Sequence, residues 1–284
     1  MLNNFQEELV HRLIQLALDE DTGTGDHTSL ACIPAEACQK AHLLVKEPGV
    51  LCGLDIAKRV CQQVDPALKI DFRLQEGADI LPGMTAFFIE GPAQSILLAE
   101  RLLLNCMQRM SGIATFTKKL SSLISHTPAV LLDTRKTSPG MRVLEKWAVL
   151  TGGGLNHRMG LFDMVMIKDN HIEYAGGIAQ AIERTRAYLI ANKLELNIEI
   201  EARNLNEVEQ IMRKGGVQRI MLDNFRPETI PEALQLIDKK YQTEASGGIG
   251  EHNLLEYAQT GVDFISIGAL THQVRSLDLS LKAC

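Results

Sequence analysis

The sequence predicts an α/β protein in which an N-terminal α+β half is followed by an incomplete parallel β/α barrel of about six units. Two observations carry this prediction. Strand-like and helical runs are mixed over roughly the first 110 residues, whereas the rest of the chain alternates strands with helices in units of about 20–35 residues. Almost every strand of the second half also ends in polar or glycine residues, which is typical of the catalytic rim of a barrel.

The first half begins with an amphipathic helical pattern and then a polar, glycine-rich loop at 19–29. The helical patterns of this half cover 4–20, 54–64 and Gln94–Met110. Its strand-like runs cover 42–47, 68–74 and 84–91. No simple alternation connects these elements, so this half is predicted to be α+β.

The second half repeats one unit, a short apolar strand followed by a helix. The predicted strands are 129–134, 164–169, 197–202, 219–224, 241–246 and 264–269. The helical patterns between them are 140–151, 176–191, 204–214, 227–239 and 251–259. Parallel strands with crossover helices fit either a barrel or a doubly wound sheet, and the polar strand ends favour the barrel. Six units are fewer than the eight of a complete barrel.

These rhythms divide the chain into an N-terminal domain at 1–112, a catalytic barrel domain at 113–272 and a C-terminal tail at 273–284. We expect the tail to pack back on the N-terminal domain. With 284 residues, of which 45% are hydrophobic and 23% charged, the chain is long enough for two cores.

Composition excludes several classes of protein. The net charge of −6 does not suggest a nucleic-acid partner, and no apolar run approaches the roughly 18 residues of a membrane span. The first twenty residues carry acids and read as an amphipathic helix, not as a signal peptide. The six cysteines form no C-x-x-C pair and no metal-finger spacing, which favours reduced thiols and a cytoplasmic location.

Polar residues recur at the ends of the six predicted barrel strands. In chain order these ends are Asp133–Lys136, Lys168–Asn170, Glu199 with Glu201, Asp223–Asn224, Glu244 with Ser246–Gly248, and Gly268. One polar strand end has little meaning, but six in a row are hard to explain by packing. Because the carboxyl ends of parallel strands share one rim, we expect these side chains to form the active site.

The rim and its loops are rich in potential cations: Arg135, Lys136, His157, Arg158 and Lys168. Cations gathered in one pocket repel one another unless a multiply anionic ligand neutralises them, and the arginine fork matches a carboxylate or a phosphate. The sequence therefore predicts an anionic substrate. By contrast, Arg142, Glu145 and Lys146 lie on a helical face and are expected to form surface salt bridges.

The last two strand ends resemble a phosphate cradle. SGGIG at 246–250 precedes a helix expected to begin near Glu251, and GALTH at 268–272 follows the last strand. Small residues let backbone N–H groups approach an anion, and barrels bind phosphate at these two units. The acidic residues Glu201 and Asp223 have three possible roles: holding Mg²⁺ directly or through water, holding sugar hydroxyls, or orienting a lysine.

Several segments together carry a family resemblance that covers nearly the whole chain: EDTGTGDHTS (20–29), AERLLLNCMQRMSGIAT (99–115), LDTRKTSPGMR (132–142), GGGLNHRMGLFDMVMIKDNH (152–171), LDNF (222–225), ASGGI (245–249) and GVDFISIGALTH (261–272). The chain resembles the quinolinate phosphoribosyltransferases, the decarboxylating nicotinate-nucleotide pyrophosphorylases of NAD biosynthesis. The combination of DTRKT, NHR and KDNH is highly specific.

The resemblance implies an N-terminal sandwich domain, an incomplete barrel, a homodimer, and a pentosyltransferase that uses quinolinate, 5-phosphoribosyl 1-pyrophosphate and Mg²⁺. It assigns catalysis to Lys168, Glu201 and Asp223, with the two acids on the ribose and metal side. Arg101 would reach the site of the neighbouring subunit. The other implied substrate-binding residues are Thr134, Arg135, Lys136, His157, Arg158, Ser246, Gly247, Gly248, Ile267, Gly268 and Ala269.

Three rival functions remain at this point. One is a lyase that uses Lys168 as a Schiff-base nucleophile, which would leave the arginines unexplained. A second is a phosphoribosyltransferase for another aromatic acid, which would keep the phosphate cradle and change the carboxylate clamp. The third is a catalytically silent phosphate-binding or regulatory protein, which would have gaps among the rim residues.

Overall fold

The computed structural model describes residues 2–284, and its two compact units are discontinuous in sequence. The first comprises residues up to Lys118, Thr137–Gly153 and Leu270–Cys284, and the second comprises Lys119–Lys136 and Gly154–Ala269. The predicted domains, by contrast, were continuous segments. The two units differ from the predicted domains for two reasons. One helix contains both residue 112 and residue 113 and so runs through the predicted boundary, and residues 137–153 belong to the first unit. Residue 1 of the predicted first domain lies outside the described residues.

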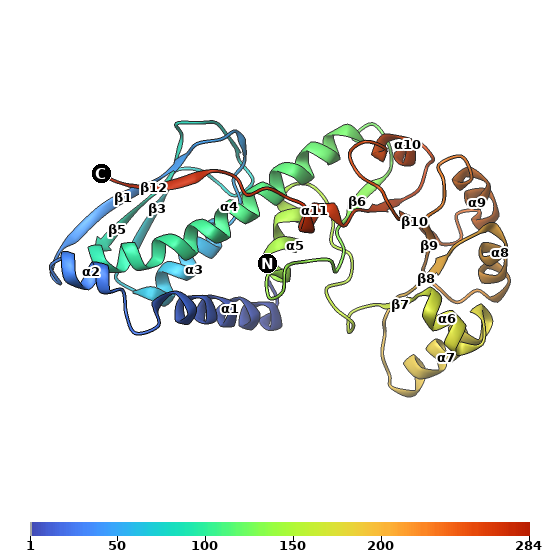
Figure 1. The fold of residues 1–284 in the computed structure, drawn as a ribbon. Coiled ribbons are helices and arrows are strands. Elements are labelled where there is room, and N and C mark those ends of the chain that lie inside the picture. The colour runs from blue at the N-terminus through green and yellow to red at the C-terminus, as the bar shows by residue number, and fades with distance from the viewer. Residues whose placement is uncertain (1) are drawn as a thin grey trace. The chain divides into compact units, whose positions relative to one another are not determined.

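The first unit is built on an antiparallel sheet of four strands in the order β12-β1-β5-β3 (Figure 1). The strands are β1 (Cys38–Val45), β3 (Lys69–Phe72), β5 (Thr85–Pro92) and β12 (Leu279–Ala283). In β1 the side chains of Ala41, Leu43 and Val45 are buried in alternation, so this strand turns one face to the core. The C-terminal tail forms β12, which pairs with β1 from Ala41↔Ala283 to Val45↔Leu279. A two-stranded sheet of β2 (Gly49–Val50) and β4 (Asp79–Ile80) completes the unit's strands.

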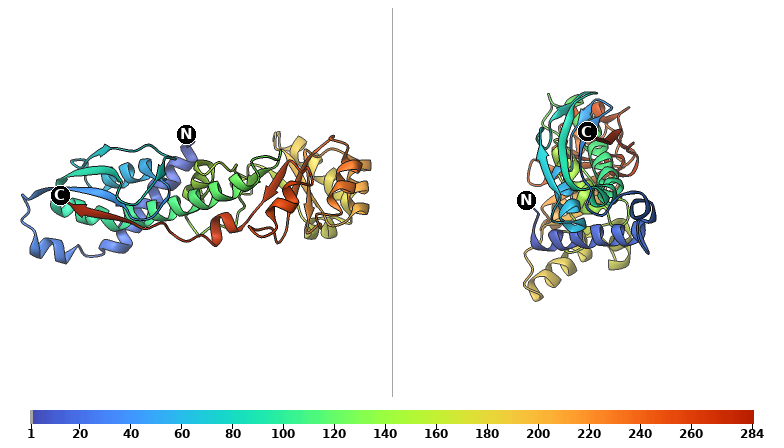
Figure 2. Two further views of the ribbon diagram at one scale, coloured as in Figure 1. Left: turned by 90° about the horizontal axis from the view of Figure 1, so that it is seen from above. Right: turned by 90° about the vertical axis from the view of Figure 1, so that its left-hand side faces the viewer.

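The first unit also contains helices (Figures 1 and 2). They are α1 (Asn4–Thr22), α2 (His27–Cys32), α3 (Leu54–Val64), α4 (Ala93–Leu123) and α5 (Arg142–Thr151). Asn3 caps α1 by accepting the backbone N–H of Gln6, and the buried Val10 and Ile14 form the inner stripe of that helix. Two expectations were wrong in extent. Helices enter the predicted glycine-rich loop from both sides, because α1 continues to Thr22 and α2 begins at His27, where Asp26 caps it. The helix α4 continues well beyond Met110.

Glu145 and Lys146 are fully buried, so the expectation of surface salt bridges is wrong for them. The Glu145 carboxylate accepts a hydrogen bond from Arg109 at 2.9 Å and the backbone N–H of Ser138 at 3.2 Å. The charge pattern of one helix cannot show that another helix covers it. Within the first unit this pair ties α4 to α5 and to the segment before α5.

The second unit is a parallel sheet of six strands in the order β6-β11-β10-β9-β8-β7. The strands are β6 (Val130–Leu132), β7 (Val165–Ile167), β8 (Ile198–Ala202), β9 (Arg219–Asp223), β10 (Gln242–Ser246) and β11 (Phe264–Ser266). Among the described residues no ladder joins β6 to β7, and β6 meets only the isolated parallel bridge Leu132↔Leu155 on that side. The predicted incomplete six-unit barrel is confirmed.

The crossover helices of this unit lie outside the strands (Figure 1). They are α6 (Asp169–Ala175), α7 (Ile178–Ala191), α8 (Leu205–Lys214), α9 (Ile230–Ile237) and α10 (Leu254–Ala258), and the short α11 (Ala269–His272) follows β11. The sequence did not predict α6, which starts directly after Lys168. In β8, IEIEA, the isoleucines alternate with Glu199 and Glu201, so both acids point to the same face of the sheet, opposite the isoleucines.

Across residues 2–284, no helix combines the length and the apolarity that a membrane crossing requires.

Candidate active site

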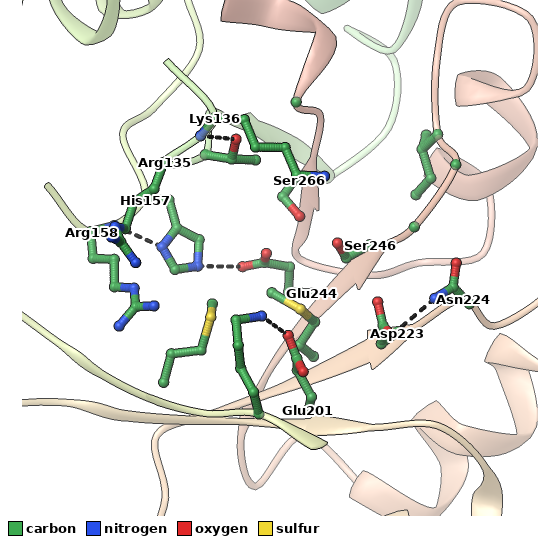
Figure 3. A pocket seen from close by; sticks show the side chains of 18 residues that line it. Arg135, Lys136, His157, Arg158, Glu201, Asp223, Asn224, Glu244, Ser246 and Ser266 are labelled. Carbon is green, nitrogen blue, oxygen red and sulfur yellow. Dashed lines mark hydrogen bonds and ion pairs between the residues drawn. The ribbon is translucent and has the colours of Figure 1, made fainter. Parts of the chain in front are cut away.

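A cavity of about 600 Å³ opens where the carboxyl ends of the six parallel strands meet. All of its lining residues belong to the second unit. The lining is Thr134, Arg135, Lys136, His157, Arg158, Met166, Lys168, Glu201, Met221, Asp223, Asn224, Glu244, Ser246, Gly247, Gly248, Ile249, Ser266 and Gly268 (Figure 3). Its volume lies within the range of small-molecule sites, and charged groups of both signs face it.

Most of the side chains that the sequence selected therefore share one cavity. Three do not line it. Ile267 is 1% exposed and belongs to the core, and Ala269 opens α11. Arg101 is exposed on α4 in the first unit.

One side of the cavity is cationic. Burial lowers the pKa of the Arg158 guanidinium, and the nearby charge of Arg135 lowers it further. Arg158 Nη1 donates one weak hydrogen bond to the backbone carbonyl of Met164, at 3.4 Å. Two like charges that disfavour each other are stabilised when an anion binds between them.

Lys168 and Glu201 form an ion pair within the cavity (Figure 3). Glu201 is 9% exposed while Lys168 is 44% exposed, so the carboxylate is the anchored partner and the ammonium reaches outward. The backbone of Lys168 is held as the N-cap of α6, where its N–H donates to His171 Nδ1 at 2.9 Å. Of the roles left open for Glu201, the orientation of a lysine is the one its contacts support.

Asp223 lies at the end of β9 and faces the same cavity. Its carboxylate accepts a hydrogen bond from Asn224 Nδ2 at 2.9 Å. Burial raises the pKa of Asp223, and the charge of Glu201 adds to this shift. A bound cation would stabilise the ionised form of this carboxylate, which forms no ion pair within the described chain.

His157 is held at its backbone and at its ring. Its backbone N–H donates to Asp133 Oδ1 at 2.9 Å, and its Nδ1 accepts the backbone N–H of Arg158 at 2.7 Å (Figure 3). A ring nitrogen that accepts a hydrogen bond carries no hydrogen, so the contact selects the neutral ring with its hydrogen on Nε2. The sequence placed a potential cation here, and the hydrogen bonding selects a neutral side chain instead.

A glycine-rich loop follows β10. Asn224 has a left-handed φ of 54°, and its backbone N–H donates to the carbonyl of Ser246 at 2.8 Å. Gly247 has φ 102°, and a Cβ there would lie 2.9 Å from the backbone nitrogen of Asn224 and would overlap its side chain. The helix expected near Glu251 begins at Leu254 and has five residues, because turns occupy the residues between. This side of the cavity is therefore formed by the loop and not by the N-terminus of a helix.

Comparisons with known proteins agree with this geometry. Residues 26–111 match the model of the quinolinate phosphoribosyl transferase N-terminal domain, and residues 113–282 match the C-terminal domain of the same family. The chain belongs to the quinolinate phosphoribosyltransferase family.

Relatives cover almost all of this family member. It is 46% identical to quinolinate phosphoribosyltransferase [decarboxylating] 1b of Nicotiana tabacum over 95% of this chain and 81% of that one. It is 40% identical to the probable nicotinate-nucleotide pyrophosphorylase [carboxylating] of Bacillus subtilis, over 92% and 89% of the two chains. The solved nicotinate-nucleotide pyrophosphorylase of Francisella tularensis superposes with a TM-score of 0.92 at 39% identity, covering 100% and 98%.

Sequence reasoning missed part of this family member's cavity wall. Met166, Met221, Ile249 and Ser266 line it, and none had been singled out. Met166 and Met221 lie in predicted strands that were expected to contribute only their polar ends. Strand alternation was the available signal, because Met221 and Asp223 are two residues apart on one strand and point to the same face.

Gly247 provides a test of the loop. We expect Gly247→Ala to raise the KM for the phosphorylated substrate at least about tenfold, because relief of the overlap with Asn224 must move the loop. Gly176→Ala is the matched control, since Gly176 has a comparable φ of 90° and nothing within 4 Å of an added Cβ. Steady-state kinetics and thermal melting measure both effects. Equal KM values in the two variants would exclude the loop from binding.

Proposed function

We propose that the chain transfers the phosphoribosyl group of 5-phosphoribosyl 1-pyrophosphate to quinolinate and releases pyrophosphate and CO2, giving nicotinate mononucleotide in NAD biosynthesis. One observation carries the proposal. A cationic wall around Arg135 and Arg158, the Lys168–Glu201 pair and a glycine loop surround one cavity in a member of this family. Its relatives in Nicotiana and Bacillus bear the names of this activity.

Quinolinate has two adjacent carboxylates and a weakly basic ring nitrogen. Arg135 and Arg158, supported by Lys136, bind the carboxylates through charge-assisted hydrogen bonds. The same positive field disfavours protonation of the ring nitrogen, which must keep its lone pair to attack the ribose C1. His157, neutral in its hydrogen bonding, holds the backbone of Arg158 in place.

Phosphoribosyl transfer breaks the bond from C1 to pyrophosphate while the bond from C1 to the ring nitrogen forms. Positive charge develops on the sugar, and the carboxylates of Glu201 and Asp223 lie in the cavity to stabilise it. Ser246, Gly247, Gly248 and Gly268 accommodate the 5′-phosphate. The nitrogen of the product is positive, so it accepts the electron pair left behind when the C2 carboxylate departs as CO2.

Mg²⁺ is expected to arrive with the pyrophosphate group, where it would neutralise charge on the leaving group. The donor set fits this role in part. Asp223 is a partly buried carboxylate whose pKa burial raises, and Mg²⁺ usually takes one or two carboxylates together with substrate phosphates. Glu201 is already committed to Lys168, so we assign the metal side to Asp223 alone, through water.

We further propose a homodimer in which Arg101 of one subunit completes the site of the other. Arg101 is exposed on α4 and has no ion pair within residues 2–284. The resemblance to the family supplies the partner's role. The six cysteines are all free, which supports a reducing, cytoplasmic setting as a proposal.

Substrate choice tests the activity. Incubation with quinolinate, 5-phosphoribosyl 1-pyrophosphate and Mg²⁺ should yield CO2 and nicotinate mononucleotide in equal amounts. Nicotinate lacks the C2 carboxylate, so its kcat/KM should be lower by roughly 30-fold or more, the factor for about 2 kcal/mol of charge-assisted hydrogen bonding. Comparable kcat/KM values for the two acids would overturn the assignment and favour a transferase for another aromatic acid.

A further inference from the structure

A cluster of four polar side chains extends from the cavity into the sheet: His157 and Glu244 line the cavity, and the other two members do not. It consists of His157, Glu199 in β8, Arg219 in β9 and Glu244 in β10. Glu199 and Glu244, called here the acid pair, are both 0% exposed. No element of the proposed reaction uses the acid pair, although buried carboxyl groups are rare unless they are paired.

His157 connects this cluster to the cavity. Its Nε2 lies 2.9 Å from Glu199 Oε2 and 3.5 Å from Glu244 Oε2 (Figure 3 shows the latter contact). Because Nδ1 accepts from the backbone of Arg158, the ring is neutral and its hydrogen is on Nε2, the nitrogen that lies within 3.5 Å of both carboxyl groups. The orientation of the His157–Arg158 segment is therefore coupled to the two carboxyl groups.

The charges of the cluster do not balance if both carboxyl groups are ionised. Arg219 Nη1 donates to Glu244 Oε2 at 2.9 Å and lies 4.0 Å from Glu199 Oε2, and its guanidinium stacks 4.2 Å above the ring of Phe264. Within the cluster, one guanidinium would then face two buried anions. An uncompensated buried charge is so costly that such a group keeps its proton instead.

The hydrogen bonds lead to the same conclusion. In the described part of the chain, neither oxygen of Glu199 accepts a hydrogen bond with standard geometry, and neither does Oε1 of Glu244, although the Ser266 hydroxyl also lies near Glu244. A carboxyl proton on one member lets it donate directly to the other, which two ionised carboxylates cannot do. One proton therefore removes the excess negative charge of the cluster and supplies a hydrogen bond between the two carboxyl groups.

We propose that Glu199 and Glu244 share one proton and, through His157, act as positioning residues that aim Arg158 into the cavity. Burial raises the pKa of Glu199, and it raises the pKa of Glu244 to about 7 with the charge of Glu199 adding to the shift. The proton makes the cluster neutral, so the positive charge of the cavity stays on its arginines and lysines. The effect on substrate binding rests on the proposed function, whereas the shared proton does not.

A metal ion is the alternative occupant, because one donor atom from each of His157, Glu199 and Glu244 lies within 4.8 Å of the others. The geometry opposes it. An Nε2 that carries the ring hydrogen has no lone pair for a metal, and Arg219 already holds Glu244. The test is the metal content of the purified protein. One metal ion per chain in the wild type, lost in both Glu199→Gln and Glu244→Gln, would show a metal site and overturn the shared proton.

Infrared spectroscopy tests the proton directly and without substrate. At about pH 6, ordinary carboxyl groups with a pKa near 4 are ionised, whereas the acid pair keeps its proton. We expect one carboxylic-acid C=O band in the wild-type protein and its loss in both Glu199→Gln and Glu244→Gln, because the remaining carboxylate pairs with Arg219. Glu207→Gln is the matched control, since Glu207 is buried but ion-paired with Arg203. Absence of the band in the wild type overturns the proposal.

The pH dependence of stability is a second readout. The folded pair holds its proton up to about pH 7, whereas the unfolded chain releases it near the ordinary value of 4.5. Between these values the folded state binds more protons, so the free energy of unfolding falls as pH rises. Each single Gln variant should flatten that slope, measured by denaturant unfolding at several pH values. The charged groups that face the pair, Arg158, Arg219 and Glu201, are unchanged in these variants.

Kinetics test the positioning role. A single Gln imitates the protonated acid, so Glu244→Gln should keep the KM for quinolinate within about threefold of wild type. Glu244→Ala removes the contact and should raise that KM at least about tenfold, while the KM for 5-phosphoribosyl 1-pyrophosphate stays within about threefold. Equal changes in both KM values would indicate general structural damage and overturn positioning. If Glu244→Ala does not fold, a large rise in the quinolinate KM of Glu244→Gln alone overturns it.

Discussion

Lys168→Ala should lower kcat/KM for quinolinate by roughly 100-fold or more, the scale for removing a preorganised charge from an active site. Lys168 is the cation that Glu201 anchors within the cavity, and its backbone is fixed as the N-cap of α6. The loss should appear in kcat as well as in kcat/KM if the charge acts mainly in the transition state. Lys214→Ala is the matched control, because Lys214 forms an ordinary ion pair with Glu183 at 2.9 Å outside the cavity.

The same residue separates the transferase from the lyase. A Schiff-base nucleophile must be a neutral amine, whereas Lys168 is paired with a carboxylate that stabilises its ammonium form. Borohydride added during turnover should leave the protein mass unchanged. A reduced substrate adduct on Lys168, located by peptide mass mapping, would move the lyase to first place.

Arg101→Ala and Lys168→Ala homodimers should each be nearly inactive, yet a mixture of the two should regain activity. In the proposed two-fold dimer each site combines Lys168 of one subunit with Arg101 of the other. A heterodimer of the two variants then has one site with both lesions and one site with neither. Random exchange makes about half of the dimers heterodimers, so activity should approach about a quarter of wild type.

A double variant with both substitutions in one chain provides the control. Mixed with either single variant, it cannot form an intact site, so no activity should return. Subunit exchange is verified by mass-tagged chains. If exchange occurs and the complementary mixture stays inactive, Arg101 acts within its own chain or not at all, and the shared-site proposal is abandoned.

The strand and helix periods were sufficient to predict the barrel half of the fold. Apolar runs of four to six residues alternating with helical patterns have few other solutions, and all six predicted strands are present. Because parallel strands end at one rim, the strand-end positions of Arg135, Lys168 and Asp223 also placed them in one cavity. The family resemblance was needed to single out Arg101, whose position on a helix gave no signal.

The alternation of strand residues does not predict how deeply each side chain is buried. Glu199 and Glu201 occupy one face of β8, so alternation treats the two as equivalent. Two residues along a strand correspond to about 6.6 Å, which separates a rim position from one inside the sheet. The structure therefore places Glu201 in the cavity and Glu199 below it, fully buried.

The sequence by itself determined the order of the elements, the rim and the excess of cations that calls for an anionic substrate, because these follow from local periods and from the shared direction of parallel strands. Only the tertiary structure decided what each charge faces. It buried Glu145 against Arg109, paired Lys168 with Glu201 and selected the neutral ring of His157. The physical reason is that burial and the partner, which come from residues far apart in the chain, set the charge of an ionisable group.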